Sequence, residues 1–281
     1  MNRRTAVLLA AFVSCAALAF ASGGRAWAGD SAKRAIDREV DLAGARSLAV
    51  RAGAGEIRVR STLARRQARP DETAAAPAPH GASATIHLEL YGAAADIAGV
   101  TLDVTRDGDQ VIVQVNEPKQ RGGWFTRSAN VGATCSVVLA ADVDVELRTG
   151  SGDIVVDGPP RGVTASAGSG RISVTAPHAA ADLHTGSGDV VVRGATSSLT
   201  MRTGSGSIQA ALSGEWSGTS IRAQTGSGDV RLAVPPGFHA DLQTHTGSGT
   251  VTNDARIVSA NSPLVSVRTG SGNVRIANAR E

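Results

Sequence analysis

Residues Val143–Ile154 read VDVELRTGSGDI, and this stretch decides the fold because its pattern returns through the second half of the chain. The tetrapeptide Thr-Gly-Ser-Gly begins at positions 149, 185, 203, 225, 246 and 269, and a variant that opens with Ala begins at 167. Successive copies start between 18 and 23 residues apart, as positions 149 and 167 and positions 246 and 269 illustrate. That spacing is typical of a repeated structural unit rather than of a catalytic motif.

Apolar residues alternate with other residues on both sides of each glycine pair. In the first copy they are Val145 and Leu147 upstream, and Ile154 and Val156 downstream. Apolar residues at every second position, often β-branched and interrupted by Gly and Pro, predict strands with one buried face. The period is two, which excludes an amphipathic helix.

Each repeat therefore supplies a strand into the Gly-Ser-Gly bend, a strand out of it, and a return turn such as Pro235-Pro236-Gly237. One unit alone cannot bury its apolar side, but stacked units align identical inward positions into one core. The predicted fold is all-β: a single elongated β-solenoid of stacked two-strand coils of about 18–23 residues, with an N-terminal hairpin cap.

The two glycines of each copy are the predicted bend residues. Glycine suits a bend because the chain there needs φ values that residues with a Cβ rarely adopt, and we expect the Ser hydroxyl to bond to nearby backbone. These bend glycines are Gly150, Gly152, Gly168, Gly170, Gly186, Gly188, Gly204, Gly206, Gly226, Gly228, Gly247, Gly249, Gly270 and Gly272.

A degenerate first copy lies far upstream, where Leu48 and Val50 lead into Gly53-Ala54-Gly55 and Ile57 follows. The predicted organisation is a signal peptide over 1–28, an N-terminal segment with this copy over 29–62, a Pro/Ala/Arg-rich linker loop over 63–83, capping strands and a hairpin over 84–140, and the seven-repeat solenoid over 141–281. The hairpin is expected to turn at Asp107-Gly108.

Residues 1–28 have the features of a secretory leader. Arg3 and Arg4 precede an apolar run, and Ala26-Trp27-Ala28 provides a small-x-small cleavage site. A lipoprotein anchor at Cys15 and a twin-arginine export signal are the alternatives. Export predicts a periplasmic, extracellular or cell-surface location, and no later apolar run reaches the roughly 20 residues of a membrane span, so no transmembrane anchor is expected in the mature chain.

The charge balance and the cysteine content argue against a nucleic-acid partner and against a disulfide. The chain has 28 Lys and Arg against 25 Asp and Glu, and removal of Arg3, Arg4 and Arg25 with the leader leaves equal numbers. The charges alternate in sign along the strands, so we expect no basic stripe and no nucleic-acid partner. Cys135 is the one cysteine outside the leader, and its apolar neighbours predict a buried thiol rather than a disulfide.

The sequence predicts no enzyme, no catalytic residue, no cofactor and no metal site. The repeated Ser lacks the G-x-S-x-G elbow of a hydrolase, and the histidines lack the spacing of zinc ligands. The alternative is a calcium-dependent or polysaccharide-acting β-helix protein, in which Asp153, Asp189 and Asp229 would gather on one face if the coils align. Arg171 falls between the first two and disfavours a ladder of calcium sites.

Residues 121–127 read RGGWFTR and stand out in a chain with few aromatic residues. Aromatic and Arg side chains dominate interfaces, so Arg121, Trp124, Phe125 and Arg127 are the candidate binding residues. The competing interpretation places Trp124 and Phe125 as a lid over the open end of the core.

The VDVELRTGSGDI frame, preceded by a leader, a first repeat and a hairpin, resembles the bacterial "putative adhesin" family of β-strand-repeat domains of unknown function. The resemblance covers about Asp37 to Ile276 and implies the solenoid fold but no catalytic residues. We expect an exported, non-enzymatic envelope or surface interaction protein whose partner is an envelope protein or a surface ligand. Self-association through the open terminal coil, or a role as envelope-stress sensor and regulatory partner of a membrane protein, are further possibilities.

Overall fold

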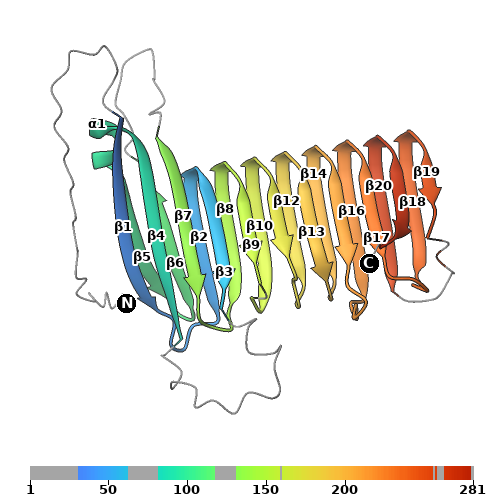
Figure 1. Ribbon diagram of the computed structural model, residues 1–281, viewed down its shortest axis with the longest axis horizontal. Helices are drawn as coiled ribbons and strands as arrows, with labels where there is room; N and C mark the ends of the chain where they lie inside the picture. Colours follow the sequence, from blue (N-terminus) through green and yellow to red (C-terminus); the bar gives the residue numbers. More distant parts are fainter. Residues whose placement is uncertain are drawn as a thin grey trace, which may run out of the picture.

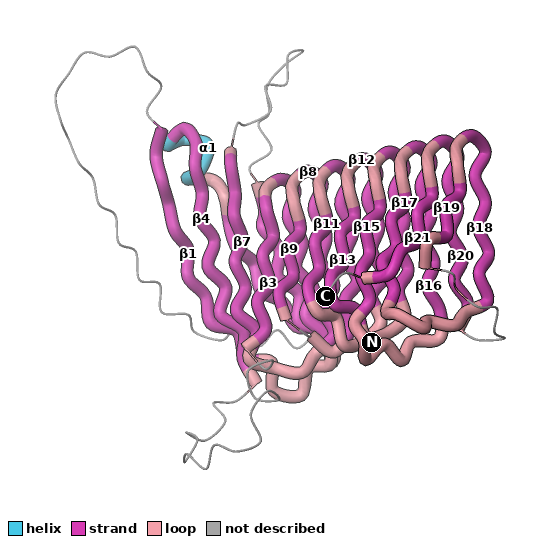
Figure 2. Tube along the Cα trace, turned by 45° about the vertical axis from the view of Figure 1, so that its right-hand side comes forward, coloured by secondary structure: helices cyan, strands magenta, loops and turns pink. Residues whose placement is uncertain are grey.

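Each repeat forms one coil of two strands that belong to two different sheets, and the coils stack into an elongated body (Figure 1). The structure is a computed structural model that describes residues 31–62, 82–117, 131–158, 160–255, 257 and 263–279. In these residues the chain forms a sheet of 11 strands and a sheet of 10 strands. The view in Figure 2 shows the repeated coil along the body.

The strands that enter the bends lie in the ten-stranded sheet, and those that leave them lie in the eleven-stranded sheet. The entering strands are β2 (Ser47–Ala54), β8 (Asp144–Ser151), β10 (Gly162–Ser169), β12 (Ala181–Ser187), β14 (Leu199–Ser205), β16 (Ser220–Ser227), β18 (Asp241–Ser248) and β20 (Leu264–Ser271). The leaving strands are β3 (Glu56–Ser61), β9 (Ile154–Asp157), β11 (Ile172–Thr175), β13 (Val190–Ala195), β15 (Ile208–Leu212), β17 (Val230–Val234), β19 (Val251–Asn253) and β21 (Val274–Asn278).

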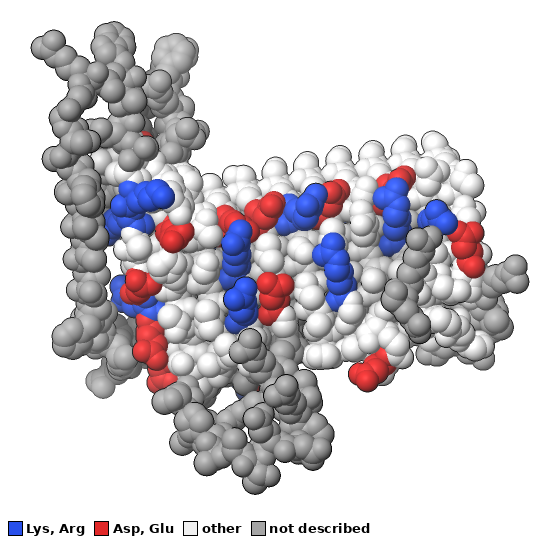
Figure 3. Space-filling view, viewed as in Figure 1, with Lys and Arg blue, Asp and Glu red and all other residues white. Residues whose placement is uncertain are grey.

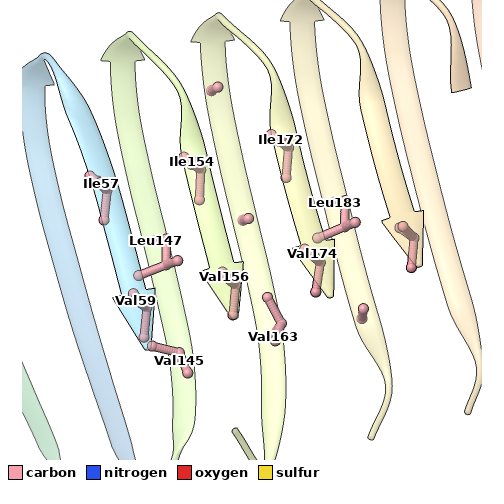
Figure 4. Close-up of a cluster of buried hydrophobic side chains, with 14 of the residues drawn as sticks. Ile57, Val59, Val145, Leu147, Ile154, Val156, Val163, Ile172, Val174 and Leu183 are labelled. Carbon is pink, nitrogen blue, oxygen red and sulfur yellow. The ribbon is translucent and has the colours of Figure 1, made fainter. Parts of the chain in front are cut away.

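Identical repeat positions lie beside one another because the coils pair in parallel and in register. Ile172 pairs with Ile154 on one side and Val190 on the other, and the degenerate first copy joins the same register through Ile57. Figure 4 shows Ile57, Ile154 and Ile172 between the sheets with Leu147. Period-two burial and the β-solenoid fold are confirmed.

The order of the coils in space differs from their order in the sequence. Strand β20 of the seventh repeat pairs with both β16 and β18, and β21 likewise pairs with both β17 and β19. The sixth repeat therefore forms the tip of the stack (Figure 1). Its inward positions include Thr244 and Asn253, which pair with the buried Val267 and Ile276 of the seventh repeat.

The opposite end is covered by strands that pair antiparallel. Strands β1 (Ser31–Asp41) and β4 (Ser83–Ala93) extend the eleven-stranded sheet beyond β7 (Gly132–Leu139). The hairpin of β5 (Thr101–Asp107) and β6 (Gln110–Asn116) extends the ten-stranded sheet, and its turn is where the sequence predicts it. The sequence does not predict strand β1.

A short helix, α1 (Ala94–Ala98), follows β4. Arg34 of β1 donates hydrogen bonds of 3.1 Å to the carbonyl oxygens of Ile97 and Ala98 at the end of this helix. A cation at the carboxyl end of a helix satisfies carbonyls that have no intrahelical partner. This contact gives the charged strand β1 a specific place on the cap.

The two glycines of each bend are required for different reasons. Gly152 has a φ of 134°, as expected, and a Cβ built on it would lie 2.1 Å from the carbonyl oxygen of Gly55 in the neighbouring coil. Gly150 has no left-handed φ, but its Cβ would lie 2.4 Å from the carbonyl oxygen of Gly53. The close approach of neighbouring coils, not backbone conformation, therefore explains the first glycine.

The bend hydroxyl that bonds to backbone belongs to Thr rather than to the expected Ser. The Thr203 hydroxyl is buried and donates to the Gly188 carbonyl oxygen of the neighbouring coil, whereas Ser205 is exposed. A buried hydroxyl needs a partner, and the inward-facing Thr finds one in the adjacent coil.

Candidate functional site

The residue before each bend Thr faces outward on the ten-stranded sheet, and stacking brings these residues into one column. Arg202 pairs with His184 on one side and Gln224 on the other, and Arg268 follows Gln224. In spatial order the column is Arg51, Arg148, Ser166, His184, Arg202, Gln224, Arg268 and His245. It contains no carboxylate.

The cations are densest toward the tip of the stack, where Arg222 adds to the column. Arg222 lies two residues before Gln224 on β16, diagonal to both Arg202 and Arg268. Diagonal neighbours of this kind are about 8 Å apart, and Arg202 and Arg268, two strands apart, are about 10 Å apart. We call these three arginines, with His184 and His245, the basic patch.

The side chains of the basic patch are exposed, and Asp182 lies on the same face, diagonal to Arg202. In the described part of the chain no carboxylate lies within ion-pair distance of Arg202, Arg222 or Arg268. Two unit charges 8 Å apart in water repel by about 0.5 kcal/mol, and salt weakens this further. The paired strands fix the positions of the arginines, so the repulsion persists and a bound anion would relieve it.

The other face carries a different pattern. Figure 3 views the eleven-stranded sheet, on which cations and anions are interspersed. Arg171 pairs with Asp189 at 3.3 Å, Arg231 with Asp229 at 2.9 Å, and Arg275 with Asp254 at 3.0 Å. On the ten-stranded sheet Arg148 likewise pairs with Glu146, at 2.7 Å. Among the described residues of this sheet, the expectation that opposite charges alternate therefore fails only at Arg202, Arg222 and Arg268. Arg202 and Arg268 of the basic patch can be found in the sequence by comparing the residue before each bend Thr across repeats.

The three aspartates of the calcium alternative lie in alternate coils, about 10 Å apart along the stack. Each uses a carboxylate oxygen to accept a backbone N–H from the next coil. Asp153 accepts from Arg171 at 2.8 Å, Asp189 from Ser207 at 2.9 Å, and Asp229 from Asn273 at 2.9 Å. The stacking does not gather these carboxylates, and their bonds hold adjacent coils together. In the described residues no group of three or more His, Cys, Asp or Glu side chains is placed to hold a metal ion.

The candidate binding residues Arg121, Trp124, Phe125 and Arg127 lie outside the described residues. Strand β6 ends at Asn116 and β7 begins at Gly132, and these ends face the edge of the stack that carries the Gly-Ser-Gly bends. Whether this loop is a lid or a contact site stays a prediction.

A groove of about 380 Å³ lies on the opposite edge, where the return loops are. Trp216 and Phe238 meet edge to face at 5.3 Å, and the Trp216 indole donates to the Ser197 carbonyl oxygen at 2.9 Å. Pro235 and Pro263 also line it, on the loops that cross between the fifth, sixth and seventh repeats. The sequence signal for this groove is the longer repeat spacing after position 203.

Cys135 is buried in the core as expected, and burial raises the pKa of its thiol to about 12. The thiolate is the reactive form of cysteine, so Cys135 contributes to core packing and not to a reaction. Among the described helices, none has the length and apolar character needed to cross a membrane.

The geometry defines a class of protein: a capped two-sheet β-solenoid with one charge-mixed face and one face that carries a basic patch. The chain belongs to the toastrack DUF4097 family, whose model matches residues 104–280, more than half of the chain. A comparison with curated proteins found no match.

Solved structures of similar proteins come from several bacteria. A "putative cell adhesion protein" from Clostridium sporogenes is 13% identical over 88% of this chain and all of that one, with a TM-score of 0.41. A "putative adhesin" from Bacteroides fragilis is 12% identical over 88% of this chain and 97% of that one, with a TM-score of 0.46. A "putative lipid binding protein" from Parabacteroides distasonis is 12% identical over 88% and 97%, with a TM-score of 0.35. The family is one of unknown function.

Proposed function

We propose that this chain is an exported, non-enzymatic interaction protein of the bacterial envelope or cell surface. The predicted leader over 1–28 supports export. The observation that carries the proposal is the basic patch: Arg202, Arg222 and Arg268 are exposed, form no ion pair with any residue that the structure describes, and are held on adjacent strands of one continuous sheet.

The scaffold suits binding because it is preorganised. Hydrogen bonds between coils, such as those of Thr203 and Asp189, fix the spacing of the outward side chains before any partner arrives. A surface that is already ordered loses little conformational freedom on binding, so more of the interaction energy appears as affinity.

Two measurements test this proposal. The full chain, produced with residues 1–28 in a bacterium, is expected in the periplasmic, envelope or extracellular fraction rather than in the cytoplasm. The purified chain from Gly29 onward is expected to co-sediment with washed envelopes, and the same chain unfolded by heat is the control. A cytoplasmic location, or no more binding than the unfolded control, would refute the proposal.

Self-association through the terminal coil remains a separate prediction. Val251 at the tip is 40% exposed and Leu242 is partly buried, so the outer edge of β18 and β19 has apolar surface to offer. Light scattering of the purified chain tests it, and a Val251→Lys variant is expected to shift a dimer to monomer. A wild-type monomer at all concentrations would remove this interaction.

A further inference from the structure

We infer that the basic patch binds an acidic polysaccharide, an inference that rests on the proposed function and names the chemical class of its partner. Three observations carry it: the arrangement of the arginines, the polar residues around them, and the placement of exposed apolar side chains elsewhere.

The arginines suit carboxylate or sulfate groups that recur along a chain. Arg202, Arg222 and Arg268 form a triangle with sides of about 8 to 10 Å on a flat sheet. A guanidinium forms paired hydrogen bonds with a carboxylate, and an unpaired one has all its donors free for a ligand. A linear chain of anionic sugars lying across the coils would meet the three cations in turn.

Most residues beside the arginines are neutral and polar. Thr200, Gln224, Gln243 and Ser266 face outward on β14, β16, β18 and β20. Two carboxylates border the patch: Asp182 beside Thr200, and Asp241, which accepts a hydrogen bond from Gln243 at 3.2 Å. Next to the patch, at the bends, is a row of exposed serines: Ser205, Ser227, Ser248 and Ser271. Hydroxyl and amide groups of this kind can exchange hydrogen bonds with sugar hydroxyls.

The same face lacks what a nucleic acid or a membrane would use. In the described residues the exposed large apolar side chains are Tyr91, Val138 and Val251, and all three lie in the eleven-stranded sheet. The patch strands therefore present no aromatic ring for bases to stack on and no apolar side chain to enter a lipid layer. The equal numbers of acidic and basic residues after removal of the leader also weigh against a general affinity for nucleic acid.

The test measures binding of the purified chain from Gly29 to immobilised alginate, a polyuronate, with neutral dextran as the comparison. We expect retention on alginate that weakens as salt increases, and none on dextran. The triple variant Arg202→Gln, Arg222→Gln and Arg268→Gln is expected to bind at least tenfold more weakly. The matched control changes three exposed arginines outside the patch, Arg60→Gln, Arg161→Gln and Arg193→Gln, and is expected to change affinity less than twofold.

All variants are exposed substitutions, and unchanged circular dichroism and melting temperature establish that they fold. Equal losses in the two triple variants would overturn the inference, because total charge rather than the patch would then set affinity. Equal affinity for duplex DNA or for phosphatidylglycerol vesicles would also overturn it. If the chain binds envelopes but not alginate, this inference is refuted and the proposed function stands. If it binds neither envelopes nor alginate, both are refuted.

Discussion

The hydroxyl of Thr203 donates a 2.9 Å hydrogen bond to the carbonyl oxygen of Gly188 in the neighbouring coil. The same bond recurs through the stack at distances from 2.9 to 3.2 Å, made by the hydroxyls of Thr149, Thr185, Thr225, Thr246 and Thr269. The repeated tetrapeptide thus encodes a contact between coils as well as a bend within each coil.

Replacement of Thr203 by Val should destabilise the fold. Valine keeps the shape but removes the buried donor, and a buried acceptor left without its partner costs about 1–3 kcal/mol. Urea unfolding followed by circular dichroism measures the loss. Thr200→Val, an outward position on the same strand, is the control and should change stability by less than about 0.5 kcal/mol. Equal effects would refute a role for the hydroxyl.

Replacement of Ala167 by Thr should stabilise the fold. Ala167 is the one bend position in the seven-repeat array without a hydroxyl, and Thr149 and Thr185 occupy the equivalent positions on either side. A new bond to the Gly152 carbonyl oxygen should contribute about 0.5–1.5 kcal/mol. Ala167→Val adds the same volume without the donor, so the difference between the two variants isolates the bond. If the valine variant is as stable as the threonine variant, no such bond forms.

Replacement of Gly170 by Ala should be severe. Its φ is 145°, and the new Cβ would lie 2.1 Å from the Gly152 carbonyl oxygen of the adjacent coil. Since backbone on both sides must move, we expect a loss of at least about 2 kcal/mol. Gly214, with open space around its Cβ position, provides the comparison: Gly214→Ala should fall within about 0.5 kcal/mol of wild type. A mild effect at Gly170 would show that the coils can separate at little cost.

Strand β1 should be held more weakly at high pH. Hydrogen bonds with Asp37 at 2.5 Å and then with Glu89 at 3.2 Å raise the pKa of His87 above its usual value. A raised pKa in the folded state means that the stabilisation is fully present below the unfolded value of about 6.5 and is lost as pH rises through the folded pKa. Intrinsic-rate-corrected hydrogen exchange of β1 amides should therefore show less protection above that pH, and His87→Gln should remove the dependence. Unchanged protection in the wild type would contradict the assignment.

The fold could be predicted because every repeat carries the same pattern. The alternation of apolar residues around Leu147 and Ile154 predicts the strands. The repetition of this pattern predicts that the coils stack, including the distant first copy at Ile57. Strand β1 was harder to predict because its charged residues show no clear alternation, and its place depends on contacts such as that of Arg34 with the end of α1. The exchanged order of the last two repeats has a weak local signal, because the sixth repeat carries Thr244 and Asn253 at inward positions where the seventh carries Val267 and Ile276. Polar residues at inward positions suit an end coil, since terminal repeats are atypical.

The candidate site was only partly predictable for a similar reason. Arg202 and Arg268 are 66 residues apart in sequence, and only the insertion of β20 beside β16 brings them two strands apart. The strongest single motif in the sequence is the aromatic cluster around Trp124, which lies outside the described residues. The pairing of Trp216 with Phe238 depends equally on the path of two return loops.

The exchanged coil order also constrains how the chain matures. During synthesis the sixth repeat emerges before the seventh, yet its docking surface is made of β20 and β21, which do not yet exist. Until β20 and β21 are made, the strands of the sixth repeat lack their native partners. The free edge of the fifth repeat could then pair with the sixth repeat instead of the seventh. Completion of the stack is therefore a late event. A chain that ends before Leu264 would expose the edges of β16 and β17, whose inward positions are apolar, and such edges are prone to pair with another chain.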